Sequence, residues 1–64
     1  MTSRELLRRL RRLGAEVVTG RGKGGHVMVK LGNRRAIVAT GSGEIPPGTF
    51  AAILKQLGLR REQL

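Results

Sequence analysis

The sequence predicts an α+β fold in which two helices cover one face of a three-stranded antiparallel sheet. Two segments with helical spacing of apolar residues lie near the two ends of the chain. Three short segments of strand-like composition lie between them, separated by glycine-containing stretches. An antiparallel meander with both helices on one side fits this order and leaves the other side of the sheet open. With 64 residues, the chain is expected to form one domain, residues 1–64.

The first helix is expected to be capped by Thr2. Glu5 stands three residues later, where it can complete a capping box. Gly14 can end the helix in the left-handed conformation. The side expected to face the core carries Leu6, Leu7, Leu10 and Leu13.

The opposite side of this helix carries a basic stripe. It is formed by Arg4, Arg8, Arg11 and Arg12, with Arg9 at its border. An acidic protein partner could bind such a stripe, because complementary charge favours association. A solvated helix face that serves only solubility is an equally good interpretation.

The predicted strands span residues 15–19, 26–31 and 34–39, and Gly32-Asn33 is a tight-turn signal between the last two. Side chains alternate between the faces of a strand. The second strand therefore places Val27, Val29 and Leu31 on one face and His26, Met28 and Lys30 on the other. The third strand places Ala36 and Val38 on one face and Arg35, Ile37 and Ala39 on the other. If the valines face the helices, His26 and Lys30 face the open side.

The second helix is expected to begin near Pro47 and Gly48, after a loop over residues 40–47. Gly58 should end it, and Leu59 can make the apolar contact of a Schellman motif. Residues 60–64 form a tail with room for one more helical turn. The apolar stripe of this helix is Phe50, Ile53, Leu54 and Leu57.

Charge points to a polyanionic partner. Thirteen lysines and arginines, ten of them arginine, stand against four glutamates and give a formal net charge of +9. A small domain with this charge attracts nucleic acid by counterion release. There is no cysteine and one histidine, so we expect no disulfide, no zinc site and no cofactor. No secretion signal and no apolar run long enough to cross a membrane is evident, so we expect a cytoplasmic protein without a membrane partner.

A basic glycine-rich loop, Gly-Arg-Gly-Lys-Gly-Gly over residues 20–25, leads directly into the single histidine. The loop matches a dinucleotide-binding spacing, but that motif should open a helix in a βαβ unit, and this loop leads into a strand. Glycines let backbone N–H groups approach phosphate oxygens, and Arg21 and Lys23 add positive charge. The phosphate-binding candidates are therefore Arg21, Gly22, Lys23, Gly24, Gly25 and Lys30.

His26 can carry catalysis at this loop. RNA supplies its own nucleophile, the 2′-OH, and an imidazole can take its proton while cations stabilise the charged phosphorus centre. A single imidazole does not serve as base and acid in the same step, so water or Lys23 must supply the second role. A lone histidine beside a glycine turn is also often a plain surface residue. The sequence leaves both interpretations open.

Several segments together resemble the HicA family of bacterial toxins. They are the Gly-Lys-Gly-Gly-His loop over residues 22–26, Arg-Arg-Ala-Ile-Val over residues 34–38, and the Pro-Gly-Thr-Phe to Leu-Gly-Leu segment over residues 47–59. The opening Ser-Arg-Glu-Leu-Leu helix over residues 3–7 also fits. The resemblance implies a fold like a double-stranded RNA-binding domain and a metal-independent ribonuclease that cleaves mRNA. It further implies a HicB-type antitoxin that covers the active site, and it places the family's catalytic histidine on His26.

Two departures from the family pattern concern the site. Family members commonly carry serine before the histidine, where this chain has Gly25. Many also carry a histidine after the third strand, where this chain has Ala-Thr-Gly-Ser over residues 39–42. The general acid is therefore unassigned. Two rival functions remain, a double-stranded RNA-binding module without catalysis, which would read duplex shape and phosphates, and a purely protein-binding role.

Overall fold

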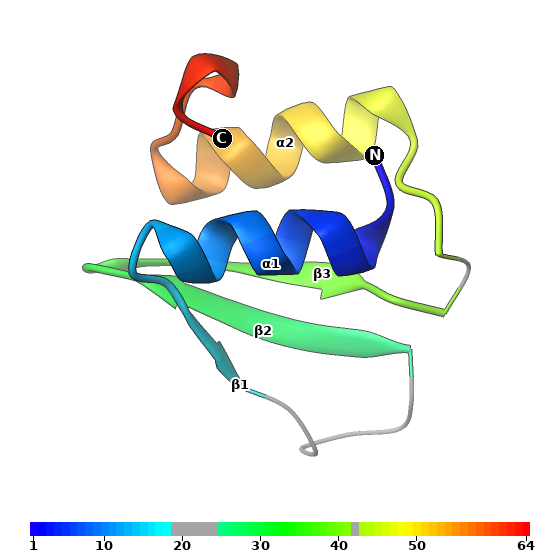
Figure 1. Ribbon diagram of the computed structural model, residues 1–64, viewed down its shortest axis with the longest axis horizontal. Coiled ribbons are helices and arrows are strands. Elements are labelled where there is room, and N and C mark those ends of the chain that lie inside the picture. The colour runs from blue at the N-terminus through cyan, green and yellow to red at the C-terminus, as the bar shows by residue number, and fades with distance from the viewer. Residues whose placement is uncertain (19–24, 42) are drawn as a thin grey trace.

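The computed structural model describes residues 1–18, 25–41 and 43–64 (Figure 1). Its elements follow the predicted order α-β-β-β-α, which confirms the α+β fold. They are α1 (Ser3–Arg12), β1 (Glu16–Val18), β2 (His26–Leu31), β3 (Arg34–Ala39), α2 (Pro47–Leu57) and a 3-10 turn η1 (Arg61–Gln63). The expectations for Thr19, for the loop over residues 20–24 and for Ser42 lie outside the described residues.

The three strands form an antiparallel meander in the order β1-β2-β3. Both helices lie on the same face of this sheet, so the other face is open (Figure 1). The registers pair Val17 with Val29, and Val29 with Ala36, on the helix-covered face. Of these, Val29 and Ala36 are buried, so the predicted assignment of the faces is confirmed.

A single apolar core joins the helices to the sheet. Leu6, Leu10, Val29 and Val38 are fully buried in it. The helical stripe predicted for α2 is buried as expected. Phe50, the one phenylalanine, tyrosine or tryptophan of the chain, lies in this core, so no side chain of these three types is available on the open sheet face. The remaining buried apolar residues are Ala15, Ala36, Ile45, Phe50, Ile53, Leu54 and Leu57.

Helix α1 begins as expected, with one difference at its cap. The Thr2 hydroxyl accepts a hydrogen bond from the Glu5 N–H at 3.1 Å. The Glu5 carboxylate binds Arg8 and Arg9, so within the described residues only the first half of the expected capping box is present. Gly14 has a φ of +97°, as predicted.

Leu13 is not part of the core, contrary to the sequence prediction. Its side chain is 39% exposed. Leu13 is the C-cap of α1, where the helix ends and the chain turns at Gly14, so it does not extend the buried row of Leu6 and Leu10.

The end of α2 is a Schellman motif, as predicted. Gly58 has a φ of +71°, its N–H donates to the Lys55 carbonyl, and the Leu59 N–H donates to the Leu54 carbonyl at 2.9 Å. Leu59 packs against the core. The predicted extra turn of the tail is present as η1.

The segment between β3 and α2 holds the start of the chain in place. The Ser3 N–H donates to the Gly43 carbonyl at 2.7 Å, and the Ile45 N–H donates to the Met1 carbonyl at 3.0 Å. Ile45 is buried, whereas its position between Gly43 and Pro46 predicted only a loop residue. This segment therefore closes the core at one end of α1.

Candidate functional site

His26 is the first residue of β2 and lies on the open face of the sheet. It pairs with Ala39 of β3, and its side chain is exposed. Its side chain makes no hydrogen bond or ion pair with the residues that the structure describes. The imidazole is therefore accessible to a ligand that approaches the open face.

Gly25, directly before His26, makes the turn into β2. Its φ is +104°, a conformation that L side chains rarely adopt. The Gly25 carbonyl accepts a hydrogen bond from the Thr40 N–H at 2.6 Å. A Cβ at Gly25 would lie 4.0 Å from Gly41 Cα, so space alone would admit a side chain. The backbone angle is therefore what favours glycine over serine here.

Along the open face, His26 is followed by an apolar row and then by a charged row. The apolar row joins Val18, Met28 and Ile37 across the three strands, and Ile37 is 55% exposed. The charged row joins Glu16, Lys30 and Arg35.

The sheet register separates Lys30 from His26. They share a face, but four residues of extended strand place them about 13 Å apart. Lys30 can therefore contact only a neighbouring part of a ligand held at His26. Arg35, which the sequence analysis placed on a face but did not assign to the site, stands beside Lys30. The alternation of β3 was the signal that could have identified it.

Four residues of the predicted phosphate-binding loop, Arg21, Gly22, Lys23 and Gly24, lie outside the described residues. Only Gly25 of this loop is located, and it lies beside His26 in the chain.

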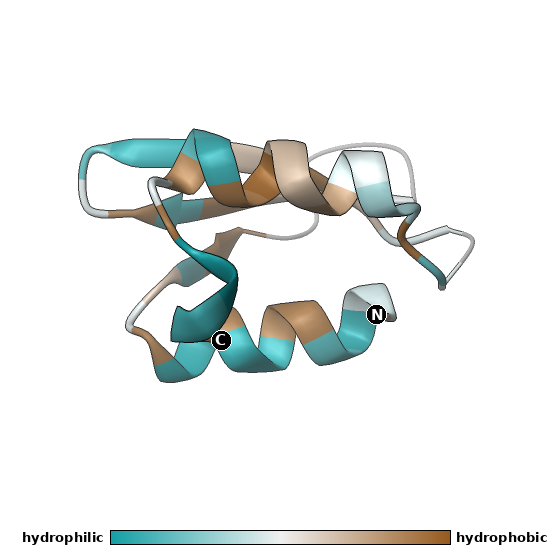
Figure 2. Cartoon of the chain, turned by 90° about the horizontal axis from the view of Figure 1, so that it is seen from above, coloured by the Kyte–Doolittle hydropathy of each residue, from teal (hydrophilic) through white to brown (hydrophobic). Residues whose placement is uncertain are grey.

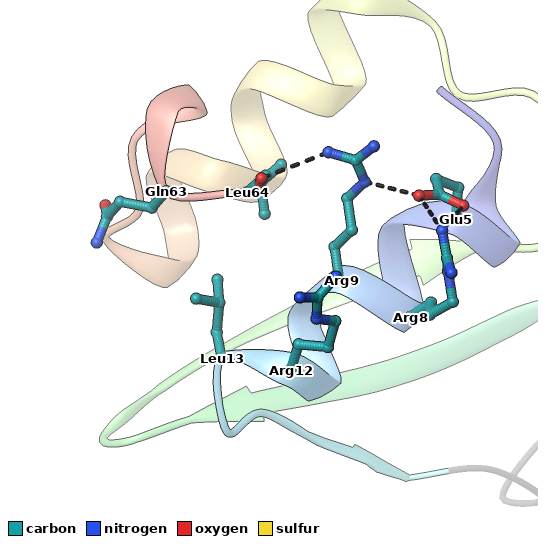
Figure 3. Close-up of a pocket in the computed structure, with 7 residues that line it drawn as sticks. All are labelled: Glu5, Arg8, Arg9, Arg12, Leu13, Gln63 and Leu64. Atoms are coloured by element: carbon teal, nitrogen blue, oxygen red, sulfur yellow. Dashed lines mark hydrogen bonds and ion pairs between the residues drawn. The ribbon is translucent and has the colours of Figure 1, made fainter.

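The basic stripe on α1 lies away from this site, in the helix layer. Its four arginines are all exposed, as predicted, and Arg9 is half-buried at the border. Arg8 and Arg9 both bind the Glu5 carboxylate, at 2.6 and 2.7 Å (Figure 3). These two guanidinium groups lower the pKa of Glu5 below its ordinary value of 4.5, chiefly through their hydrogen bonds.

The described residues give no sign of a metal centre or a membrane segment. No three potential metal ligands among histidine, cysteine, aspartate and glutamate cluster in the part of the chain that the structure describes. None of the described helices is long and apolar enough to cross a bilayer.

Comparison with protein families identifies the family of this chain. The family model described as HicA toxin of bacterial toxin-antitoxin matches residues 3–59, which is most of the chain. No curated protein matches the sequence. The matched range contains all the strands, both main helices and His26.

Proposed function

Because the chain belongs to the HicA toxin family, we propose that it is a metal-independent endoribonuclease that cleaves mRNA with His26 as its catalytic histidine. The observation that carries this proposal is the exposed imidazole on the open sheet face, directly after a glycine turn. Family membership makes the chain the toxin of a toxin–antitoxin system. The type II classification and the HicB type of its antitoxin belong to the proposal, as does a cytoplasmic location.

In the proposed reaction, the RNA 2′-oxygen attacks the adjacent phosphorus and the bond to the 5′-oxygen breaks. His26 takes the proton of the 2′-OH, and the leaving 5′-oxygen receives a proton from water or from Lys23. His26 then returns its proton to the solvent. A cyclic phosphate and a free 5′-hydroxyl result, and no metal or cofactor is required. General base catalysis of this kind contributes roughly 10²- to 10⁴-fold in rate.

Positive charge would hold the substrate in this reaction. Arg21 and Lys23, with the glycine N–H groups of the same loop, would bind the phosphate next to His26. Lys30 and Arg35 would bind a phosphate further along the strand, because their row lies about 13 Å from the imidazole. The substrate would thus cross the open face along β2.

The test compares the wild type with His26→Ala, each expressed without antitoxin. We expect wild-type expression to arrest growth and degrade mRNA, and His26→Ala to reduce RNA cleavage at least about a hundredfold. Gln56→Ala serves as the control, because Gln56 is exposed on α2, on the other side of the sheet. Circular dichroism verifies that all three proteins are folded.

Equal RNA decay with His26→Ala and with the wild type would remove His26 from the mechanism. Intact RNA after long incubation with folded wild-type protein would instead favour the double-stranded RNA-binding module. That module would show RNA affinity falling steeply with salt, because its contacts are with phosphates.

A further inference from the structure

The helix layer contains two adjoining hollows that share Arg9 and Leu64. One has a volume of about 360 Å³ and lies beside the end of α1 (Figure 3). The other has a volume of about 450 Å³ and lies between the start of the chain, α2 and η1. The Arg9 side chain lines both hollows, and its Nη1 donates to the Leu64 carbonyl at 3.4 Å. We call the two hollows together the helix-side groove.

The floor of the second hollow is apolar. It is formed largely by Ile45, Pro46, Pro47 and Phe50, with Leu64 at the junction. Leu64 packs against the core, and the exposed Leu13 lines the first hollow. Figure 2 shows the last turn of the chain crossing from the end of α2 toward α1. An occupant would therefore meet apolar surface at the bottom of the groove.

The groove is lined by four arginines and by two glutamates, Glu5 and Glu44, so its rim carries a net positive charge. Arg8, Arg9 and Arg12 line the first hollow, and Arg61 lines the second. Glu5 holds Arg8 and Arg9 in position, whereas Arg12 makes no ion pair within the described ranges. The Arg61 guanidinium lies 5.7 Å from the centre of the Phe50 ring. The rim thus presents arginine side chains on both sides of an apolar floor.

We propose that the helix-side groove binds an acidic amphipathic helix of a protein partner. Apolar side chains of such a helix would fill the floor, and its glutamates or aspartates would pair with the arginine rim. RNA fits less well, because unpaired bases stack on aromatic faces and the only ring of the groove is buried beneath Arg61.

The position of the groove gives the proposal a functional consequence. The helices lie on the face of the sheet opposite to His26 (Figure 1). An occupant of the groove therefore leaves the open sheet face free, and the chain can hold a protein partner and RNA at the same time. This contact differs from one that blocks His26, and it does not depend on His26 being catalytic.

Two variants with the same charge change test the proposal. Arg12 lines the groove, whereas Arg11, its neighbour on α1, lines neither hollow. The probe is a labelled synthetic helical peptide with one leucine stripe flanked by glutamates, followed by fluorescence anisotropy with the purified full chain. We expect Arg12→Glu to weaken peptide binding about tenfold and Arg11→Glu to change it less than about twofold.

His26→Ala is measured in parallel and should bind the peptide as the wild type does, so a failure of the ribonuclease proposal would leave this result unchanged. Equal weakening by Arg11→Glu and Arg12→Glu would show attraction by overall charge only and would overturn the proposal. Absence of peptide binding by the folded wild type would also overturn it. The same holds if Arg12→Glu weakens binding of a labelled RNA duplex and leaves peptide binding unchanged.

Discussion

The open sheet face and the helix-side groove carry positive charge in two different ways. On the sheet, the paired backbones of β2 and β3 set the spacing between His26 and the row of Lys30 and Arg35. In the groove, long arginine side chains are held by side-chain contacts, chiefly those of Glu5. A hydrogen-bonded sheet fixes where a reactive group stands, which suits chemistry. Arginines on a helix can adapt to the shape of a partner, which suits recognition.

The largest loss of stability is expected from a substitution in the core, which supports both the open sheet face and the helix-side groove. Leu10 is fully buried between α1 and the sheet. Leu10→Ala should lower the free energy of unfolding by about 2–5 kcal/mol, because it leaves a cavity in the core. Urea denaturation followed by circular dichroism measures this loss.

Leu13→Ala is the matched control for Leu10→Ala. Leu13 follows the same helix but is 39% exposed, so its loss should cost less than about 1 kcal/mol. Similar losses for the two variants would mean that Leu13 packs in the core, as its spacing in the sequence suggested.

A smaller effect, confined to the sheet side, is expected from Gly25→Ser, which introduces the serine that is common in the family. Because Gly25 has a φ of +104°, the variant should be destabilised by about 1–2 kcal/mol. Gly41→Ser is the control, because a Cβ there would make only an ordinary contact, 3.7 Å from Gly25 Cα. Chemical denaturation of both variants measures the difference.

If Gly25→Ser is as stable as Gly41→Ser, the angle at Gly25 does not restrict the residue type. Under conditions where the Gly25→Ser protein is folded, its affinity for the acidic peptide should equal that of the wild type. A change in that affinity would show that the two faces are coupled.

The smallest effect is expected from Glu5→Gln and depends on pH. The folded state lowers the pKa of Glu5, so the ionised carboxylate contributes stability above its ordinary value of 4.5 and loses it as the pH falls through the lowered pKa. The variant should therefore melt at a lower temperature than the wild type at neutral pH, and the two should converge in acid. Thermal melts at several pH values measure this.

Glu62→Gln is the control for Glu5→Gln, since it removes an exposed glutamate of η1. A constant difference in melting temperature between Glu5→Gln and the wild type at all pH values would contradict the role of the Glu5 ion pairs.

The sequence predicted the sheet well because local patterns determine it. Val27, Val29 and Leu31 alternate with polar residues, so burying one face fixes the other. The end of α2 could also be predicted from local sequence, because Gly58 and Leu59 form a Schellman motif with residues of the preceding helical turn. The match of the family model over residues 3–59 confirms the predicted membership of the HicA toxin family.

Features that depend on contacts between distant residues were not predicted. Ile45 stands alone in a loop without periodicity, so its burial became visible only with the fold. The Arg9 side chain donates a hydrogen bond to the carbonyl of Leu64, 55 positions further along the chain. No local sequence pattern predicts this contact. The groove is formed partly by this contact between distant residues, so it could not be predicted from the sequence. His26 could be predicted, because the glycine-rich loop lies directly before it in the sequence.

The bonds that tie Met1 and Ser3 to residues 43–45 set an order of events during synthesis. Met1 and Glu44, whose charges pair at 2.9 Å, are 43 positions apart, so α1 leaves the ribosome well before its anchor exists. The hairpin of β2 and β3 needs only local contacts and can form earlier. Docking of α1 is then expected late, when most of the chain has been made.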